Sequence, residues 1–493
     1  MTTAAPAEHI LFLTGRLAYD SLSRELEHLS QRPPSAQTFS YRIHELGLKV
    51  AALMTSAMIQ RRLQAADVEG VDRIIVPGLC SGDLNALSAH LNIPVQRGPK
   101  DLKDLPEFFG AQGKPVDLSQ YAVRIFAEIV DAPHLSIEQI VAHARRYRAD
   151  GADVIDLGCL PEVPFPHLSE AIQALQAEGC QVSVDSLQEQ DLLQAGRAGA
   201  DYLLSLKEST LWIADQVASV PVLIPEQPGD MESLYRAAET LQQQNRRFLA
   251  DAILDPIHFG FTASLVRYHA LRQRLPDAEI MLGTGNVTEL TDADTTGMTA
   301  LLLGIASELD IDAILTTEVS PHARTAVREA DLARRMLCAA KRDGNLPRRY
   351  HPGLMALRDR KPFPYTPDEI ATTAQAIKDP SYRIQLSTQG IHIYNRDGLH
   401  TAQDPFALFP HLQLKDDPGH AFYLGVELGR AQIAWQLGKR YLQDNQLSWG
   451  VVVAESEPEL ASGSESNSKA TKVTDAYQSP GTTLTQRKKT PKT

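Results

Sequence analysis

Cysteine is scarce in this sequence. The 493 residues include four cysteines, far apart and without a CxxC pair: Cys80, Cys159, Cys180 and Cys338. Disulfide frameworks and zinc knuckles both need cysteines at short, regular spacings, so neither is encoded. Reduced thiols are therefore expected, and they agree with a cytoplasmic location.

Long apolar runs are absent as well. A membrane-spanning helix needs about 20 consecutive apolar residues, and no stretch of this sequence approaches that length. The opening residues, MTTAAPAEHILFLTGR, lack the basic start and the longer apolar core of a secretory signal. We expect neither a membrane span nor an export signal.

Positive charge is in short supply. Lys and Arg together number 48 against 61 Asp and Glu, which gives a net charge of −13. Proteins that coat nucleic acid or bind anionic membranes present a basic surface. No nucleic-acid or membrane partner is therefore expected, although a local basic pocket for a phosphate is compatible with this charge.

Phosphate-binding signatures are also lacking. Neither GxGxxG nor the P-loop pattern follows the expected strands. Two glycine-containing turns remain, at Thr14–Arg16 and at Gly78–Asp83. Each admits two interpretations, an anion-binding turn or a tight turn in which Ser81 or Asp83 caps the next helix.

The sequence does contain a regular alternation of apolar strands and amphipathic helices. Residues 1–120 predict a small parallel α/β domain, with one of its helices at 50–63. Residues 121–342 repeat the strand–helix unit, 343–379 form a linker, and 380–453 form a small α+β module. The polar residues 454–493 predict a disordered tail.

The central segment carries eight short apolar runs, each followed by a helical pattern. The predicted strands are 122–130, 152–158, 180–185, 200–206, 220–225, 251–256, 279–285 and 312–317. Runs without polar alternation are typical of strands buried on both faces. Eight consecutive units favour a (β/α)8 TIM barrel over a doubly wound open sheet, the alternative fold.

The C-terminal module has two recognisable patterns. Residues 381–405 predict a β-hairpin, and 420–445 predict one long amphipathic helix. The fold class expected for the whole chain is therefore α/β, with a TIM barrel between a small parallel α/β domain and a small α+β module.

Polar residues that close the predicted barrel strands are the candidate site, because the chemistry of such barrels lies at the carboxyl ends of the strands. The candidates are Asp156, Asp185, Lys207, Glu226, Asp255, Asn286, His322 and Arg324. A carboxylate at a strand end can accept two N–H groups from a flat ring, and an amide can both donate and accept. Capping of the following turn is the alternative role for any one of these aspartates.

The stretches GADVIDLG, VSVDS, AGADYLLSL and ILDPIHFGF, in this order, resemble the pterin-binding barrel of dihydropteroate synthase. The same barrel occurs in the methyltetrahydrofolate-dependent corrinoid methyltransferases. The whole arrangement resembles the dihydropteroate synthase-related proteins of archaea and cyanobacteria, which join such a barrel to an N-terminal α/β domain and a small C-terminal domain.

This resemblance implies roles for several of the candidates. Asp185 and Asp255 match positions that hold the polar edge of a pterin, and Asn286 matches the methyltransferase amide that reaches N5. His322 and Arg324 are loose counterparts of the pyrophosphate-binding residues of the synthase, at the expected start of the last helix. The alternative interpretation is that Arg324 is an ordinary surface arginine and His322 an ordinary histidine at the start of a helix. Asp156, Lys207 and Glu226 are further candidates for the pocket.

The departures from the synthase pattern concern the second substrate. The chain has GCLPEVPF where the synthase has GGESTRP, LLSLKE where the synthase has a strand-end Asn, and GTGNVTEL where the synthase has a Ser-Arg-Lys segment. The cobalamin-binding string DxHxxG that would support the methyltransferases is absent too.

The expected function is thus that of a pterin-binding transferase of folate, pterin or one-carbon metabolism. It would catalyse condensation on a pterin or methyl transfer from one. The expected cofactor or substrate is a pterin or folate-type small molecule, with no metal. A non-catalytic pterin carrier, sensor or scaffold and an unrelated barrel enzyme are the alternatives. Barrels of this type often dimerise, so a homodimer is one expected assembly.

Overall fold

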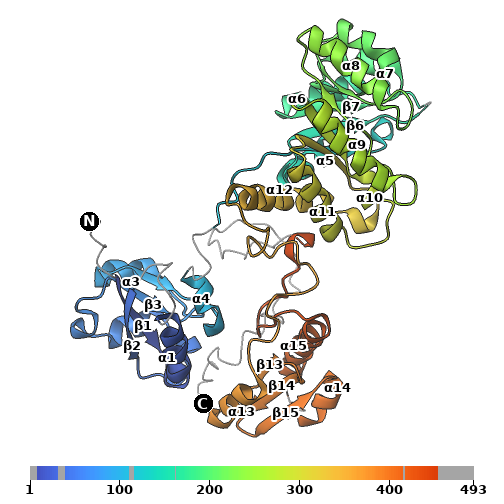
Figure 1. Cartoon of the computed structure of the whole chain (residues 1–493). Helices are drawn as coiled ribbons and strands as arrows, with labels where there is room; N and C mark the ends of the chain where they lie inside the picture. The colour runs from blue at the N-terminus through green and yellow to red at the C-terminus, as the bar shows by residue number, and fades with distance from the viewer. Residues whose placement is uncertain (1–7, 31–38, 110–115, 162, 415–416, 454–493) are drawn as a thin grey trace, which may run out of the picture. The chain divides into compact units, whose positions relative to one another are not determined.

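The computed structural model describes residues 8–30, 39–109, 116–161, 163–414 and 417–453. The tail predicted to be disordered lies outside these residues. The described chain forms two compact units. One takes in the described residues within Met1–Val116 and Arg358–Leu447, and the other those within Asp117–Leu357 and Ser448–Ser464 (Figure 1).

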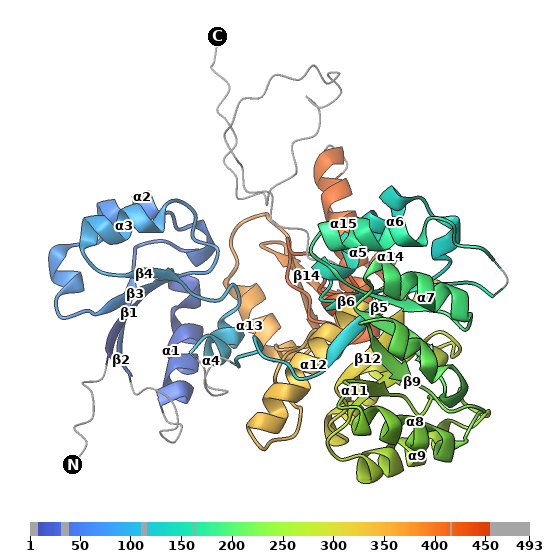
Figure 2. The same cartoon turned by 90° about the horizontal axis from the view of Figure 1, so that it is seen from above.

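The N-terminal domain is built on a four-stranded parallel sheet of order β2-β1-β3-β4 (Figure 2). Its strands are β1 (Glu8–Thr14), β2 (Phe39–Glu45), β3 (Arg73–Val76) and β4 (Val95–Arg97). Its helices are α1 (Arg16–Ser30), α2 (Ser56–Arg62), α3 (Leu84–Leu91) and α4 (Leu105–Phe108), with 3-10 turns η1 (Ala51–Leu53), η2 (Ala65–Val68) and η3 (Leu102–Asp104).

Alternate residues of β1 pack on opposite faces of this sheet, as the two-residue period of a strand requires. Ile10 and Phe12 pack with Leu22 and Leu26 of α1. Leu11 packs on the other face, in the cluster that holds the buried residues of α2 and α3. The sheet is therefore covered by α1 on one face and by α2 and α3 on the other.

The helix predicted at 50–63 is wrong in part. The segment contains the short turn η1 and then α2, separated by an extended stretch. Thr55 causes the break, because its hydroxyl accepts a hydrogen bond from the backbone N–H of Met58 at 3.2 Å and so caps α2.

The central segment is a closed barrel of eight parallel strands, which confirms the TIM barrel and excludes the open sheet. The strands are β5 (Arg124–Ile129), β6 (Val154–Gly158), β7 (Gln181–Asp185), β8 (Tyr202–Leu206), β9 (Val220–Leu223), β10 (Leu249–Ala250), β11 (Glu279–Gly283) and β12 (Ala313–Thr317). Each pairs with the next in the chain, and β12 closes the ring on β5.

Helices surround this barrel (Figure 1). They are α5 (Ile137–Ala149), α6 (Leu168–Ala177), α7 (Glu189–Ala198), α8 (Met231–Gln243), α9 (Phe261–Arg274), α10 (Gly285–Thr288), α11 (Thr295–Glu308) and α12 (Ala326–Arg342), with the short η4 (Ala132–His134) and η6 (Pro321–Ala323). The α-helix expected after the fourth barrel strand is instead the 3-10 helix η5 (Glu208–Gln216).

The barrel interior is filled by apolar side chains and turns polar toward the carboxyl ends of several strands. Phe126 of β5 and Val154 of β6 belong to the apolar interior cluster, together with Leu249 of β10. Two residues further along, on the same face, lie Glu128 on β5, Asp156 on β6 and Asp251 directly after β10. The strand period therefore aims carboxylates into the carboxyl-terminal mouth of the barrel.

The sixth barrel strand, predicted at 251–256, is wrong in its position. The strand β10 consists of Leu249–Ala250 alone. Asp251 ends it, because its Oδ1 accepts the backbone N–H of Ile253 at 2.7 Å and Ile253 takes a φ of 63°. A β-branched residue rarely adopts this left-handed conformation, so Asp255 follows a strained turn and does not close a strand.

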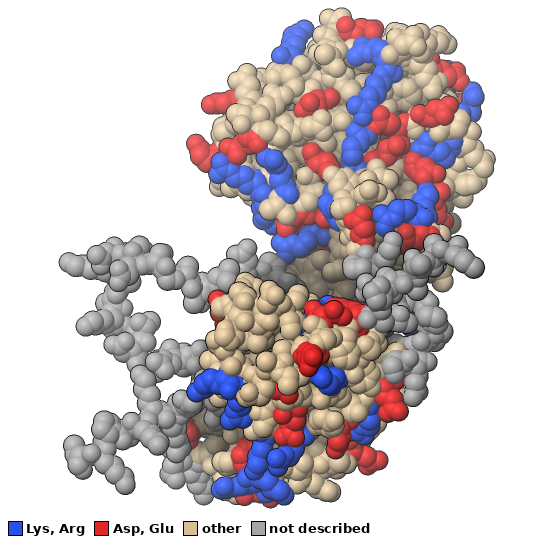
Figure 3. Space-filling view, turned by 90° about the vertical axis from the view of Figure 1, so that its left-hand side faces the viewer, with Lys and Arg blue, Asp and Glu red and all other residues tan. Residues whose placement is uncertain are grey.

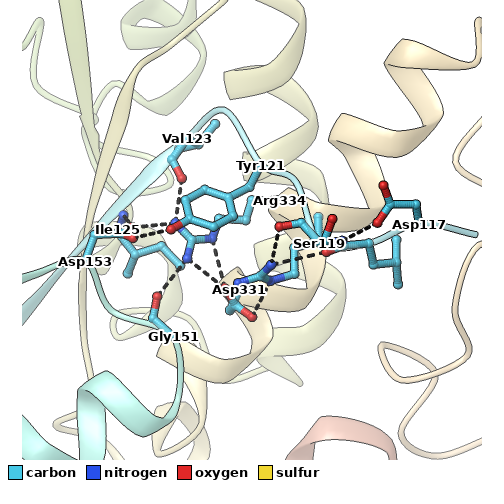
Figure 4. Close-up of polar contacts among 11 residues, drawn as sticks. Asp117, Ser119, Tyr121, Val123, Ile125, Gly151, Asp153, Asp331 and Arg334 are labelled. Carbon is cyan, nitrogen blue, oxygen red and sulfur yellow. Dashed lines mark hydrogen bonds and ion pairs between the residues drawn. The ribbon is translucent and has the colours of Figure 1, made fainter.

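Arg334 of α12 holds the opposite, amino-terminal edge of the barrel together (Figure 4). Its side chain is 1% exposed. It forms an ion pair with Asp153, donates to Asp331 and to the carbonyl of Gly151 at 2.7 and 2.8 Å, and lies over the ring of Tyr121. The last helix is thereby tied to the segments that lead into the first two strands.

The C-terminal module is a three-stranded antiparallel sheet covered by helix α15 (Pro418–Leu437). Its strands are β13 (Arg383–Ser387), β14 (Gly390–Asn395) and β15 (Gly398–Ala402), and its shorter elements are α13 (Pro367–Ala376), α14 (Pro405–Leu408) and η7 (Phe409–His411). The remaining 3-10 turn, η8 (Gly450–Val452), belongs to the barrel unit.

Two predictions for this module need correction. The predicted hairpin has a third strand, β15, because the turn at Asp397 returns the chain along β14. The predicted helix 420–445 ends at Leu437, because Gly438 takes a φ of 71°, the left-handed conformation that terminates helices.

The surface carries charges of both signs. On the face drawn in Figure 3, Lys and Arg side chains are interspersed with Asp and Glu side chains. None of the helices in the described part of the chain combines the length and the apolar character that crossing a membrane requires.

Candidate functional site

Three carboxyl groups meet at the mouth of the barrel. Glu128, Asp156 and Asp185 stand at the carboxyl-terminal ends of β5, β6 and β7, which are neighbours in the ring. One oxygen from each lies within 4.8 Å of the others. We call these three residues the acidic triad. Two of them, Asp156 and Asp185, were expected from the sequence as pocket residues, and Glu128 was not among the chosen candidates.

Asp156 is the most deeply placed of the three. It is fully buried, and its Oδ1 accepts a hydrogen bond from the hydroxyl of Ser183 at 2.5 Å. Its Oδ2 is buried without a hydrogen-bond partner among the described residues. Burial raises the pKa of Asp156 well above its ordinary value, and the neighbouring Asp185 and Glu128 raise it further.

The other two members of the acidic triad titrate near neutrality. Burial raises the pKa of Glu128 to about 7, with repulsion from Asp185, Asp131 and Glu289 added. Burial likewise raises the pKa of Asp185 to about 7, with repulsion from Asp251 added. Carboxyl groups this close share protons near pH 7, because full ionisation would place like charges together.

Asp251 extends the acidic lining to the sixth strand position. Its carboxylate accepts hydrogen bonds from the hydroxyl of Tyr268 and from the backbone N–H of Ile253. Burial raises its pKa to about 6, against the lowering effect of the Tyr268 hydrogen bond. Sequence reasoning missed Asp251, although the signal was present, since it lies two residues after the inward-facing Leu249.

Asp255 lies in the loop after β10, paired with a cation. Its Oδ2 accepts a hydrogen bond from Nη2 of Arg267 at 2.7 Å. The same arginine group donates to the carbonyl of Ile253 at 2.8 Å, so the pair fixes the loop. Arg267 was not predicted, and it already supplies one of the donors that the Asp255 carboxylate can accept.

Asn286 is brought next to Asp255 by a backbone contact. Its Nδ2 donates to the carbonyl of Leu254 at 2.8 Å, which joins α10 to the loop after the neighbouring strand β10. This hydrogen bond leaves the side-chain oxygen of Asn286 as an acceptor. The structure thus joins Asp255 and Asn286 at one side of the mouth, with the acidic triad on β5, β6 and β7.

Lys207 and Glu226 follow β8 and β9. Glu226 accepts hydrogen bonds from the backbone N–H and the hydroxyl of Ser209, at 3.1 and 2.9 Å. The backbone N–H of Lys207 donates to the hydroxyl of Thr210 at 2.9 Å. Both residues hold the turn η5 in place, and in the described structure neither hydrogen-bonds to the acidic triad.

His322 and Arg324 lie beside the start of α12. Nε2 of His322 is 3.0 Å from the carbonyl oxygen of Thr288, and Arg324 donates to the carbonyl of Pro321 at 3.0 Å. Two backbone amides between β12 and η6 already have an acceptor. Glu289 accepts from Val319 and Ser320, at 3.0 and 2.8 Å.

A second carboxylate caps α12 itself. Glu318 accepts the backbone N–H of Val327 at 3.1 Å, and burial raises the pKa of Glu318 to about 7. An incoming anion at this end of α12 would therefore have to displace the protein's own carboxylates, since helix-start amides favour negative charge from any source.

Cys80, in the turn after β3, and Cys159, directly after β6, are poor nucleophiles. Burial raises the pKa of Cys159 to about 12, with repulsion from Asp191 and Asp156 added. Burial also raises the pKa of Cys80, against the attraction of Arg97. Because the thiolate is the reactive form, neither thiol is activated at neutral pH.

The mouth of the barrel suits a ligand that is rich in donors. In the described part of the chain, no Lys or Arg forms an ion pair with Glu128, Asp156 or Asp185. Three carboxyl groups without a cationic partner can accept N–H groups of a flat heterocycle. Their oxygens are also of the kind that Mg²⁺ and Ca²⁺ prefer, and the triad is the group of residues here that could hold such an ion.

Comparison with known proteins gives one family match and one relative. Residues 8–100 match a family of unknown function (DUF6513). An uncharacterised protein of Methanocaldococcus jannaschii is 28% identical over 374 residues, which cover 66% of this chain and 70% of that protein.

Similar solved structures include several dihydropteroate synthases. The enzyme of Yersinia pestis with a pterin–sulfa conjugate is 17% identical over 46% of this chain and 96% of its own, with a TM-score of 0.36. The enzyme of Coxiella burnetii with pteroic acid is 15% identical over 46% and 95%, with a TM-score of 0.37. That of Xanthomonas albilineans is 20% identical over 47% and 95%, with a TM-score of 0.35.

Proposed function

We propose that this protein is a pterin-binding enzyme whose barrel holds the pteridine ring at its carboxyl-terminal mouth. The observation that carries the proposal is the acidic triad, in which Asp156 is buried and Glu128 and Asp185 are half-buried. The triad lacks a cationic partner among the described residues. The sequence resemblance to pterin-binding barrels gives the same location for the ligand. A pterin is a suitable ligand because its N3–H and 2-amino groups form a donor pair.

Asp185 is the residue proposed to accept that donor pair. Its carboxylate can take two N–H groups side by side, and such charge-assisted hydrogen bonds are shorter and stronger than neutral ones. Asp156 and Glu128 would lie beside the ring and keep the pocket acidic. Asn286 has a free side-chain oxygen that can accept from a protonated ring nitrogen.

The reaction is proposed as group transfer at the pterin. In one form, an arylamine displaces pyrophosphate from a dihydropterin pyrophosphate and forms a C–N bond. In the other, a nucleophilic acceptor takes the methyl group from N5 of a reduced methylpterin. The C–N electron pair stays on N5, which gains the proton that the acceptor loses, and a hydrogen bond to N5 stabilises the amine that remains. In either form, the residues of this chain bind the pterin, orient it and stabilise the charge that develops on the ring.

A specific observation favours the alternative of a non-catalytic pterin carrier or sensor. Glu318 already accepts a backbone amide at the start of α12, and Glu289 accepts two amides of the segment between β12 and η6. A pyrophosphate group would need such donors. A protein of this kind would bind pterin tightly and turn nothing over.

Titration with 7,8-dihydropterin, followed by fluorescence, tests the binding. Asp185→Asn should weaken binding by about 1–3 kcal/mol, roughly 5- to 150-fold, because a charged acceptor of two donors is lost. Asp277→Asn, an exposed aspartate beside the opposite end of β11, is the matched control and should leave the affinity unchanged. Absence of pterin binding in the parent protein would overturn the proposal.

Incubation with a dihydropterin pyrophosphate and 4-aminobenzoate distinguishes the enzyme from the carrier. An enzyme of the condensing kind releases pyrophosphate and forms a dihydropteroate that mass spectrometry detects. Pterin binding with no product from this pair, and no demethylation of a methyl-tetrahydropterin in the presence of a thiol acceptor, would favour the carrier.

A further inference from the structure

We propose that the N-terminal domain holds a second small-molecule site, at the carboxyl edge of its sheet, for a ligand with an apolar ring body and one anionic group. A cavity of about 280 Å³ opens there. It is lined at the carboxyl ends of the four strands by Thr14, Leu17 and Ala18 and by residues 50–52, 77–79 and 98–100. This site lies in the other compact unit from the barrel and does not depend on the pterin proposal.

The strand order explains why a cavity forms at this place. In the order β2-β1-β3-β4, the chain leaves β1 and β3, which are neighbours, toward opposite faces of the sheet. The helix after β1 is α1, which packs on the face of Ile10 and Phe12. The helix after β3 is α3, which packs on the face of Leu11. Connections that diverge in this way leave a crevice outside the carboxyl ends of the strands, where open α/β sheets bind ligands.

Two glycines fix the walls of the cavity by close backbone contacts. A Cβ at Gly15 would lie 2.7 Å from the backbone nitrogen of Ala51. A Cβ at Gly78 would lie 2.5 Å from the backbone carbonyl of Pro99. The loops after β1 and β2, and those after β3 and β4, are therefore packed backbone against backbone, and the shape of the cavity is set by the main chain.

The walls are apolar and so is the rim. Phe12, Leu22, Ile75 and Leu105 line the interior. At the rim, Leu79 is 52% exposed and Leu17 is 41% exposed. Large apolar side chains held in water beside an apolar cavity favour a ligand that covers them, since binding removes their surface from water. The body of the ligand is therefore expected to be a ring system without charge.

Among the described residues that line the cavity, one is cationic and none is acidic. The residue is Lys100, and its ammonium donates to Oδ1 of Asn445 at 2.8 Å. An ammonium has three N–H donors, so two remain for a ligand. The ligand is therefore expected to carry one anionic group, such as a carboxylate or sulfonate, at the Lys100 side.

The start of α1 argues against a nucleotide. A phosphate chain at a helix start needs free backbone amides. Here the amides of Arg16 and Leu17 donate to the carbonyls of Leu48 and Lys49, at 2.8 and 3.1 Å, and that of Ala18 donates to Gly15. These donors are used within the protein, and the anionic group of the ligand is left to Lys100.

Titration with 1-anilinonaphthalene-8-sulfonate tests the site, because this dye is an aromatic anion. The parent protein should show saturable binding at one dye per chain. Ala18→Phe fills the mouth of the cavity and should weaken that binding at least tenfold, with an unchanged circular dichroism spectrum. Ala52→Phe, on the facing loop, should weaken dye binding to the same extent. It replaces Ala18→Phe as the test if that variant misfolds.

The role of Lys100 is tested by a matched set of variants. Lys100→Met should weaken dye binding three- to tenfold, and it should not affect the neutral analogue N-phenyl-1-naphthylamine. Asn445→Ala removes the same Lys100 hydrogen bond but keeps the ammonium, so dye binding should persist. Lys361→Met removes an exposed lysine outside the cavity and should change nothing.

The outcomes that overturn the proposal are equally definite. Saturable binding that Ala18→Phe and Ala52→Phe leave unchanged would place the dye elsewhere. No saturable binding by the folded parent protein would exclude an apolar anion as the ligand class. Equal losses for the anionic dye and the neutral analogue in Lys100→Met would exclude the charge contact.

Discussion

Buried carboxyl groups dominate the barrel mouth at the scale of single residues. An ionised carboxylate that loses water without gaining a partner is costly, and the protein avoids part of that cost by holding protons near neutral pH. The raised pKa values of Glu128 and Asp185, both about 7, express this cost. Strongly shifted carboxyl groups cluster at functional sites, where a ligand can supply the missing partners.

Glu128→Gln should stabilise the folded protein, and more so at higher pH. The ordinary pKa of this group is 4.5 and its folded-state pKa is about 7. Below pH 4.5 the group is neutral in both states and costs nothing, whereas above pH 7 the folded state carries the full cost of the buried charge. The gain should therefore grow between these values and reach about 1–3 kcal/mol at pH 8.

Urea unfolding at pH 4.5 and at pH 8 measures this gain. Glu170→Gln, an exposed glutamate on α6, is the control and should show no difference between the two pH values. A loss of stability in Glu128→Gln at pH 8 would show that the charge is stabilised by partners within the protein. It would contradict the interpretation of the acidic triad as a pocket that accepts hydrogen bonds from a ligand.

At the scale of elements, the sequence predicts strands well where apolar runs are long and poorly where a side chain turns the backbone. Seven of the barrel strands lie within or close to the apolar runs that predicted them. The sixth does not, because the hydrogen bond of Asp251 to the Ile253 amide ends the strand before the apolar run does. Propensity alone does not reveal such a local bond.

Substitution of Arg334 in α12 tests how much its ion-pair network stabilises the barrel unit. Arg334→Leu should destabilise the barrel unit by about 3–5 kcal/mol, because Asp153 and Asp331 would be left without their buried cation. Calorimetry detects this as a lower unfolding temperature. Arg61→Leu, on an exposed face of α2 in the other unit, should leave that transition in place. An unchanged transition in Arg334→Leu would show that the network contributes little to stability.

At the scale of the whole molecule, the repeat of strand and helix was sufficient to predict the barrel. The count of eight units follows from local patterns and favours a closed barrel over an open sheet, and the structure confirms that the ring closes. The contacts that complete the site do not. The pairing of Arg267 with Asp255 and the capping of the amides at Val319 and Ser320 by Glu289 depend on loops brought together by packing.

The same holds for the first compact unit, which joins segments far apart in the chain. Arg440 of the C-terminal module pairs with Asp101 of the N-terminal domain at 2.7 Å, and Lys103 pairs with Glu369 at 3.1 Å. Nothing in the local sequence around these residues indicates their partners, because an ion pair depends on distance in space and not on spacing in the chain.

The central claim is that ionised Asp185 accepts the donor edge of a pterin. Calorimetric titration with 7,8-dihydropterin at pH 7, in two buffers of different ionisation enthalpy, tests it most directly. With a free-state pKa of about 7, binding should release about half a proton, and affinity should rise from pH 6 to pH 8 as the carboxyl ionises. Binding without proton release, or binding that weakens over this range, would contradict the account.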